Sequence, residues 1–244
     1  MKLLLLAGSR EASALAGLLA NEAKILTIAS LAGVTREPQD LPVQMRIGPF
    51  GGRDAFVKYL RDQAFDALID ATHPFAARIS KRSVEVAAEM KLAHLQIMRP
   101  AWQAGAGDNW IFIASEREAA RHIPVGSTVL LATGRQTLQR FDNMSGRYLI
   151  CRQIESTDGD FPFASGEYLI GHPPFSVEEE IKLFKERGVQ WLVVKNAGGM
   201  PSQSKLLAAR QLGIPVLLIN RPPLLDCQRV ETAKAAYDWV KGLL

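Results

Sequence analysis

The sequence predicts an α/β protein with parallel sheets, because one pattern recurs along most of its length. Short apolar runs are followed by Gly, Ser or Thr and then by amphipathic stretches, which is typical of βα units. The chain has 244 residues and is 48% hydrophobic, so it can bury a full core as one large or two small domains. We therefore expect strands and helices to alternate throughout.

The first hundred residues repeat this pattern several times. We expect strands near residues 3–6, 25–28, 67–69 and 94–97, and helices near residues 10–20, 53–63 and 76–90. Elements of these lengths make up a compact domain of ordinary size. Residues 1–99 are therefore expected to form one Rossmann-like domain, which would bind a nucleotide cofactor.

A segment that breaks the pattern follows, because residues 99–110 combine a Pro with closely spaced glycines. Beyond it, we expect strands near 128–132, 148–152, 168–170, 191–194 and 215–219, and helices near 177–187 and 202–212. Residues 100–244 would then form a second Rossmann-like domain that binds substrate, with a cleft between the two domains. The last helix, 231–243, could pack on either of them.

The two halves begin alike, since residues 3–10 and residues 129–135 both run from an apolar strand into a Gly turn. An old duplication explains this likeness, but so does the general form of βα units. In either case, parallel sheets place their ligand crevices at the carboxyl ends of the strands.

The first loop, residues 7–12, lies between the first strand and the first helix. A phosphate there would meet free amide groups at the helix N-terminus, and Gly8 would let the backbone approach closely. The loop lacks the full Gly-x-Gly-x-x-Gly pattern, so a tight turn with Ser9 as the helix N-cap is an equally open reading.

The end of the second strand carries no acidic residue, whereas an NAD-binding domain normally has one there. Ser30, Thr35 and Arg36 stand nearby instead. Hydroxyls and a guanidinium suit a 2′-phosphate, because Arg makes charge-assisted bonds to its oxygens. We therefore predict NADPH rather than NADH.

Two further glycine loops precede helices, one around Gly51 and Gly52 and one from Lys195 to Gly199. Such glycine pairs leave space for a ring system or point amides at a carboxylate. In the second loop Lys195 and Asn196 follow a strongly apolar strand, and Lys205 lies on the next helix. These lysines bind an anionic ligand or are simply exposed; the sequence leaves both readings open.

Several other classes are disfavoured. Lys and Arg exceed Asp and Glu by 29 to 25, for a net charge of +4, without the basic run expected of a nucleic-acid-binding protein. Cys151 and Cys227 lack metal-ligand spacing, and the sequence has no His-Glu-x-x-His pair, Gly-x-Ser-x-Gly elbow or Walker pattern. No apolar run is long enough for a membrane span or a signal peptide, so we expect a cytoplasmic protein.

Five stretches, in their order and spacing, resemble the precorrin-6A reductases of cobalamin biosynthesis, including the variant that acts on cobalt-precorrin-6A. The stretches are residues 6–12 (Leu-Ala-Gly-Ser-Arg-Glu-Ala), 30–33 (Ser-Leu-Ala-Gly), 50–52 (Phe-Gly-Gly), 70–76 (Asp-Ala-Thr-His-Pro-Phe-Ala), and 195–199 (Lys-Asn-Ala-Gly-Gly) with Lys205, 208–210 and 220–222. The resemblance covers nearly the whole chain. This chain differs from the family pattern at Ala7-Gly8-Ser9, where the family often has Gly-Gly-Thr, and at Ala197, where the family often has Ser.

The resemblance implies a reductase that passes a hydride from NADPH to precorrin-6A, a tetrapyrrole-derived macrocycle with many carboxylates, to give precorrin-6B. A reductase of a smaller enone or ketone and a non-catalytic NADPH sensor are the alternatives. We expect a monomer or weak homo-oligomer, without nucleic-acid, membrane or metal partners. His73 is a candidate acid or, as we prefer, a positioning group, and His172 lies in a similar turn of the second half.

The loops and the resemblance together nominate two sets of residues. We expect the cofactor to be bound by Gly8, Ser9, Arg10, Glu11, Ser30, Ala32, Gly33, Arg36, Gly51, Gly52 and Thr72. We expect the substrate to be bound by His73, Phe75, Gly134, Arg135, His172, Lys195, Asn196, Gly198, Gly199, Lys205 and Arg221, with His73 and Lys195 as the catalytic candidates.

Overall fold

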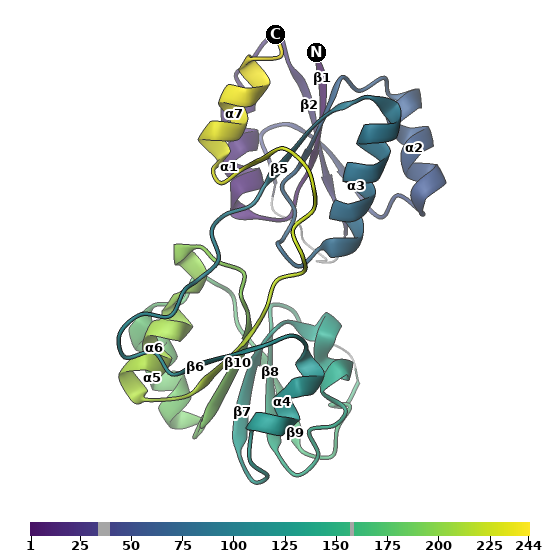
Figure 1. Ribbon diagram of the computed structural model, residues 1–244. Coiled ribbons are helices and arrows are strands. Elements are labelled where there is room, and N and C mark those ends of the chain that lie inside the picture. The colour runs from purple at the N-terminus through teal and green to yellow at the C-terminus, as the bar shows by residue number, and fades with distance from the viewer. Residues whose placement is uncertain (34–39, 157–158) are drawn as a thin grey trace. The chain divides into compact units, whose positions relative to one another are not determined.

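The computed structural model describes residues 1–33, 40–156 and 159–244, which fold into two compact α/β units (Figure 1). The first unit contains Met1–Pro100 and Pro222–Leu244, and the second contains Ala101–Arg221. Each unit has one six-stranded sheet in which every strand pair is parallel. The predicted α/β class with two Rossmann-like domains is therefore confirmed.

The first unit is built around a sheet with the spatial order β12-β5-β4-β1-β2-β3. Its strands are β1 (Lys2–Leu6), β2 (Leu26–Leu31), β3 (Gln44–Ile47), β4 (Ala67–Asp70), β5 (Ala93–Ile97) and β12 (Arg229–Val230). With β12 as the sixth strand, this order is 3-2-1-4-5-6, as in dinucleotide-binding Rossmann domains. The order reverses at β1, which lies between β2 and β4, so the crevice at the ends of β1 and β4 is the expected ligand site.

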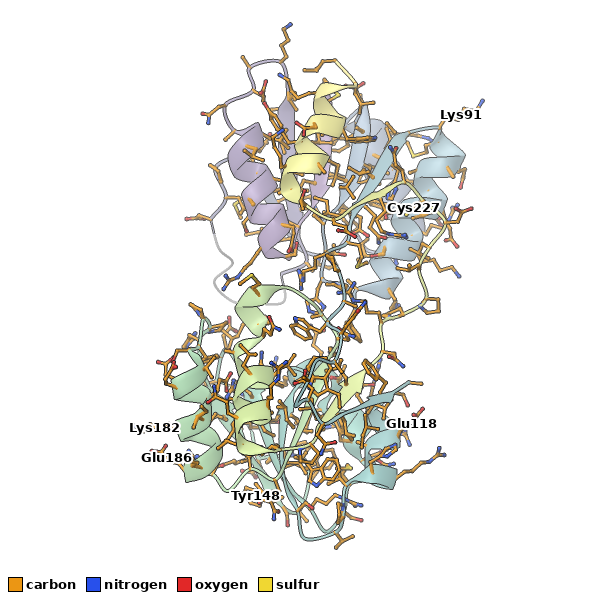
Figure 2. All side chains as sticks on the ribbon, turned by 60° about the vertical axis from the view of Figure 1, so that its left-hand side comes forward. Lys91, Glu118, Tyr148, Lys182, Glu186 and Cys227 are labelled. Carbon is orange, nitrogen blue, oxygen red and sulfur yellow. The ribbon has the colours of Figure 1, made fainter. Side chains whose placement is uncertain are left out.

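Helices cover both faces of this first sheet. They are α1 (Arg10–Leu19), α2 (Arg53–Asp62), α3 (Ala77–Met90) and α7 (Ala233–Lys241). The alternation of side chains along β1 separates two cores: Leu3 and Leu5 pack with α1 and α7, whereas Leu4 and Leu6 pack with α2 and α3. Helices α1 and α7 lie side by side (Figure 1). Lys91, labelled in Figure 2, is the C-cap of α3 and has a left-handed conformation with φ 55°.

The second unit has the sheet order β6-β11-β10-β7-β8-β9. Its strands are β6 (Trp110–Ile113), β7 (Thr128–Ala132), β8 (Tyr148–Gln153), β9 (Gly166–Ile170), β10 (Trp191–Lys195) and β11 (Val216–Ile219). Its helices are α4 (Ala119–His122), α5 (Val177–Glu186) and α6 (Ser204–Leu212), with 3-10 turns η1 (Glu116–Glu118), η2 (Arg135–Phe141) and η3 (Met200–Ser202). Helices α5 and α6 pack on the face formed by Leu130, Ile150 and Leu192.

The two sheets share one spatial arrangement, but the sixth edge strand comes from a different part of the chain in each. Counted from β7, the second sheet also has the order 3-2-1-4-5 followed by a sixth strand, and β7 takes the place of β1. That sixth strand is β6, which precedes β7 along the chain, whereas β12 follows the other strands of the first sheet. The order in the second unit therefore reverses at β7, between β8 and β10.

Several details differ from the sequence expectations. Strands β3, β6 and β12 were not expected, and Trp110 begins β6 rather than ending the connection. Residues 222–230, expected in the second domain, belong to the first unit because β12 pairs with β5. The final helix α7 packs on α1, because its buried Ala236 and Val240 complete the same core. Within the described residues, no helix is long and apolar enough to cross a membrane.

Candidate functional site

The turn after β1 leaves an open approach to the N-terminus of α1. Gly8 has φ 140°, and a Cβ placed there would meet no atom within 4 Å. Ser9 caps the helix, since its Oγ accepts a 3.2 Å hydrogen bond from the Ala12 amide. Open space, free helix amides and the positive end of the helix dipole suit a phosphate group.

Ser9 also joins the two loops that meet where the strand order reverses. Its hydroxyl donates a 2.7 Å hydrogen bond to the carbonyl of Ala71, the residue that follows β4. The Ser9 hydroxyl is therefore occupied within the protein as donor and as acceptor. Its part in cofactor binding would be to shape the turn and present the backbone amides.

Strand β3 places a guanidinium beside the end of β2, and the sequence did not single out this group. Arg46, in β3, donates a 2.9 Å hydrogen bond to Oγ of the buried Ser30 and a 3.0 Å bond to the carbonyl of Gly48. Its guanidinium lies over the rings of Phe50 and Tyr59, at 4.1 and 5.1 Å from their centroids. The expected residues Thr35 and Arg36 lie outside the described part of the chain.

Arg46 was missed because β3 is a short strand with mixed polarity. The register of β2 and β3 pairs Ser30 with Arg46, which could not be inferred before the strand itself was identified. The signal available in the sequence was a lone Arg in a weak alternating segment, with Phe50 a few residues beyond it.

The loop after β4 is held from below by a buried carboxylate. Asp70 is 1% exposed, and its Oδ1 accepts hydrogen bonds from the Thr72 amide (3.1 Å) and the Thr72 hydroxyl (2.7 Å). Its Oδ2 accepts a 3.1 Å bond from Gln96, which in turn accepts a 3.0 Å bond from Arg229 of β12. Strand β12 thus supports the loop that carries His73.

His73 is exposed at the surface of this loop. Its Nδ1 accepts a 3.2 Å hydrogen bond from the Phe75 amide, and the two rings lie 5.9 Å apart. Because Nδ1 acts as an acceptor, the neutral imidazole carries its proton on Nε2. The Phe75 amide thus fixes the orientation of this exposed ring, which suits the positioning of a polar ligand.

The remaining expected cofactor residues all lie in the first unit. Glu11 forms a 2.6 Å ion pair with Arg99, so its carboxylate is neutralised within the protein. Gly52 is the N-cap of α2 with φ 124°, and its carbonyl accepts a 3.2 Å bond from Arg82. Exposed residues complete the set, namely Arg10, Ala32, Gly33 and Gly51.

The equivalent crevice of the second unit carries a lysine. Lys195, at the end of β10, donates a 2.7 Å hydrogen bond from Nζ to the carbonyl of Thr133, which follows β7. Burial lowers the pKa of Lys195, and the neighbouring Glu116 opposes this effect. Gly134 comes next with φ 78°, and a Cβ there would meet no atom within 4 Å. Arg135 begins η2. Burial raises the pKa of Cys151 to about 11, and the nearby positive charge of Arg135 partly opposes this rise.

Asn196 and Arg221 hold the loop after β10 in place. The Asn196 side chain accepts a 2.8 Å bond from the Trp102 amide and donates a 3.1 Å bond to the Trp102 carbonyl. Arg221 donates to the carbonyls of Asn196 (2.7 Å) and Ala197 (2.9 Å), and the carbonyl of Gly199 accepts a 3.0 Å bond from the Trp102 indole. These contacts shape the loop that contains Gly198 and Gly199, so a direct contact of the Asn196 amide with substrate would require their rearrangement.

Lys205 lies beside a buried ion pair that was not anticipated. Arg152 and Glu180 form two 2.7 Å hydrogen bonds, and Glu180 has a fully buried side chain. Lys205 donates a 2.7 Å bond to the carbonyl of Ser202, and burial lowers its pKa to about 8. Arg152 also lies over the ring of Phe175, 4.7 Å from its centroid, while His172 is exposed in the preceding loop. Cationic groups therefore gather at this edge of the second sheet.

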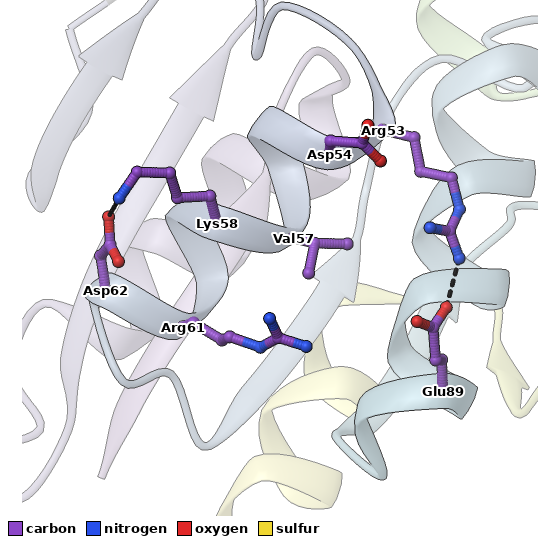
Figure 3. Close-up of a pocket in the computed structure, with 7 residues that line it drawn as sticks. All are labelled: Arg53, Asp54, Val57, Lys58, Arg61, Asp62 and Glu89. Atoms are coloured by element: carbon purple, nitrogen blue, oxygen red, sulfur yellow. Dashed lines mark hydrogen bonds and ion pairs between the residues drawn. The ribbon is translucent and has the colours of Figure 1, made fainter.

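A separate hollow of about 480 Å³ lies on the outer side of α2 (Figure 3). Arg53 pairs with Glu89 of α3, and Lys58 forms a 2.6 Å pair with Asp62. The charged side chains that line this hollow are mixed in sign, and most of them pair with one another. We therefore prefer the crevices at the strand ends as ligand sites. Across the described residues, no cluster of three or more His, Cys, Asp or Glu side chains is placed to hold a metal ion.

Comparison with known families identifies the chain. Residues 2–241 match the family model described as "Precorrin-6x reductase CbiJ/CobK". The chain belongs to this family. Its membership agrees with the resemblance seen in the five sequence stretches.

Individual members of the CbiJ/CobK family match over almost their full length. A precorrin-6A reductase of Rhodococcus erythropolis is 38% identical and covers 99% of this chain and 98% of its own. A precorrin-6A reductase of Rhodobacter capsulatus is 35% identical, and the match covers 98% of this chain and 95% of that protein. The solved structure of a CobK precorrin-6A reductase has a TM-score of 0.93 at 34% identity, covering 99% of this chain and 96% of its own.

Proposed function

We propose that this member of the CbiJ/CobK family is an NADPH-dependent precorrin-6A reductase. It would reduce one double bond of precorrin-6A to give precorrin-6B in the biosynthesis of adenosylcobalamin. The observation that carries this proposal is the family match over residues 2–241, in a chain whose first unit has the 3-2-1-4-5-6 strand order.

The residues of the first unit fit a dinucleotide. The open Gly8 turn and the α1 amides suit its pyrophosphate. Gly33 (φ 72°) lets the chain leave β2 close against Ile47 and Gly48, in a conformation that favours glycine. Arg46 supports NADPH over NADH, because its guanidinium lies at the end of the strand where the ribose 2′-phosphate is recognised in such domains.

The second unit fits a ligand with several carboxylates. Lys195 ends β10, Arg135 begins η2 after β7, and Lys205 lies in the first turn of α6. Their positive charges attract a polyanionic macrocycle and orient its side chains. This proposal keeps the sequence expectation that the second domain binds the substrate.

When bound, NADPH supplies a hydride. The contribution of the chain is to bind, orient and protonate, so most of the rate enhancement would come from positioning. His73 would donate a hydrogen bond from Nε2 to the substrate, and Asp70 and Thr72 would hold the loop that presents it. Lys195 would neutralise substrate charge or, as the alternative acid, deliver a proton.

A direct assay tests this function. The protein is mixed with NADPH and precorrin-6A, or with its cobalt complex, while the absorbance of the reduced nicotinamide and the mass of the pigment are followed. Stoichiometric loss of NADPH with a gain of two hydrogens in the pigment is the expected result. NADPH binding without oxidation would indicate a sensor, and turnover only with simple enones would indicate a different reductase.

A further inference from the structure

Two buried side chains at the ligand edge of the second sheet have polar atoms without a hydrogen-bond partner among the described residues. They are Thr133, with an unpaired Oγ1, and Gln153, with unpaired Oε1 and Nε2. Thr133 is 6% exposed and Gln153 is 7% exposed. Unpaired buried polar groups destabilise a fold, so two such side chains at one crevice indicate a place where a polar ligand binds.

Thr133 directly follows β7 and Gln153 ends the neighbouring strand β8, and Figure 1 shows these two strands. The register of β7 and β8 pairs Leu131 with Cys151, so two residues further along Thr133 stands beside Gln153. Strand alternation places both side chains on the sheet face of Leu131 and Cys151, which is the face opposite α5 and α6.

The same row continues to a cation on the other side of β7. Val194 pairs with Ala132, so the next residue, Lys195, stands beside Thr133 and donates to its carbonyl. Gly134, directly after Thr133, leaves open space where a side chain would otherwise stand. The row Gln153, Thr133 and Lys195 thus combines an amide, a hydroxyl and an ammonium group next to the open space at Gly134. The unpaired Thr133 and Gln153 atoms are themselves covered, so they meet a ligand there only after their side chains turn toward that space.

We infer that Thr133 and Gln153 form a subsite for one carboxylate of the substrate. The Gln153 Nε2 and Thr133 Oγ1 groups donate to its two oxygens, and the Lys195 ammonium balances its charge. This inference rests on the proposed function, because it takes the carboxylate to belong to precorrin-6A.

The test uses Thr133→Val and Gln153→Met, which keep the shape of each side chain and remove the unpaired polar atoms. Binding of metal-free precorrin-6A to the full chain is measured by calorimetry without NADPH, and thermal unfolding is measured without ligand. Each variant should raise the Kd about 10-fold, and the double variant should lose less than the product of both effects. Without ligand, each Tm should stay equal or rise.

Thr27→Val is the matched control. Thr27 lies in β2 of the first unit and is 4% exposed, and its Oγ1 is also unpaired among the described residues. Its replacement should leave the Tm equal or higher and the Kd for precorrin-6A unchanged. The methyl ester of precorrin-6A provides a second control, since its binding should not distinguish Thr133→Val or Gln153→Met from the wild type.

The outcomes separate this inference from the proposed function. If the wild type reduces precorrin-6A but both variants bind it with unchanged Kd, the subsite is wrong while the function stands. A lower Tm in both variants with unchanged Kd would show that the polar atoms serve a buried water or an internal contact, which also overturns it. Absence of binding and turnover in the wild type would overturn the function and the subsite together.

Discussion

Ser9 donates a 2.7 Å hydrogen bond from Oγ to the carbonyl of Ala71, which joins the loops after β1 and β4 in the first unit. Lys195 makes the corresponding link in the second unit, where its Nζ donates a 2.7 Å bond to the carbonyl of Thr133. In each case one side chain connects the two loops at the strand where the order reverses. The first unit uses a neutral hydroxyl there and the second uses a cation, in agreement with different ligands for the two crevices.

Replacement of Ser9 tests the structural role of this link. Ser9→Ala removes both the N-cap of α1 and the bond to Ala71, so the free energy of unfolding should fall by about 1–3 kcal/mol. The Kd for NADPH should rise severalfold in equilibrium titration. Thr232→Ala is the control, because Thr232 caps α7 in the same unit. It should cost about 0.5–2 kcal/mol and leave the affinity for NADPH unchanged.

Most of the fold could be predicted because βα units leave strong local signals. The apolar strands 3–6 and 128–132 and the amphipathic helices 10–20 and 177–187 appear in the structure within a residue or two. Strand β12 could not be predicted, because its two residues are defined only by their pairing with β5. The same applies to the order of the strands, which depends on contacts between distant segments.

Arg46 should determine the preference for the phosphorylated dinucleotide. Arg46→Met removes a charge-assisted contact, so the Kd for NADPH should rise about 10–100-fold while the Kd for NADH changes little. Fluorescence titration with both dinucleotides measures the ratio. Arg61→Met, in the hollow on α2, is the charge-matched control and should change neither value. An equal loss of affinity for both dinucleotides would assign Arg46 a structural role instead.

His73 should act mainly by positioning. His73→Ala should raise the KM for precorrin-6A and reduce kcat by less than about 100-fold, because the bond from the Phe75 amide to Nδ1 fixes the ring in a positioning role. His73→Asn is the matched variant, since its side-chain oxygen can accept the same Phe75 amide. It should keep the thermal stability of the wild type. A fall in kcat of about 1000-fold or more in both variants would point to proton transfer by His73.

Lys205 should make stability depend on pH. Its pKa is lowered from 10.5 to about 8 by burial, so between these values the unfolded chain binds more protons than the folded chain. The stability of the wild type relative to Lys205→Met should therefore increase as the pH rises from about 8 toward 10.5. Urea unfolding across this range measures the difference. Lys182→Met, on the outer side of α5 (Figure 2), is the matched control, because it removes a lysine charge from the same unit.

The candidate site was only partly accessible from sequence. Gly8, Ser9, Thr72 and Lys195 could be found because they directly follow or end apolar strands. The supporting contacts could not, since Ser9 meets Ala71 and Asn196 meets Trp102 across long separations in the chain. Buried polar atoms such as those of Gln153 become visible only when burial and partners are both known.

A single-turnover reaction with NADPH deuterated at the transferred position of C4 tests the central claim most directly. The protein is incubated with this cofactor and precorrin-6A, and the pigment is analysed by mass spectrometry. We predict a product that has gained one deuterium from the cofactor and one hydrogen from solvent, with one NADPH oxidised per pigment. Oxidation of the cofactor without deuterium in the pigment, or an unchanged pigment beside bound cofactor, would contradict the assignment as a precorrin-6A reductase.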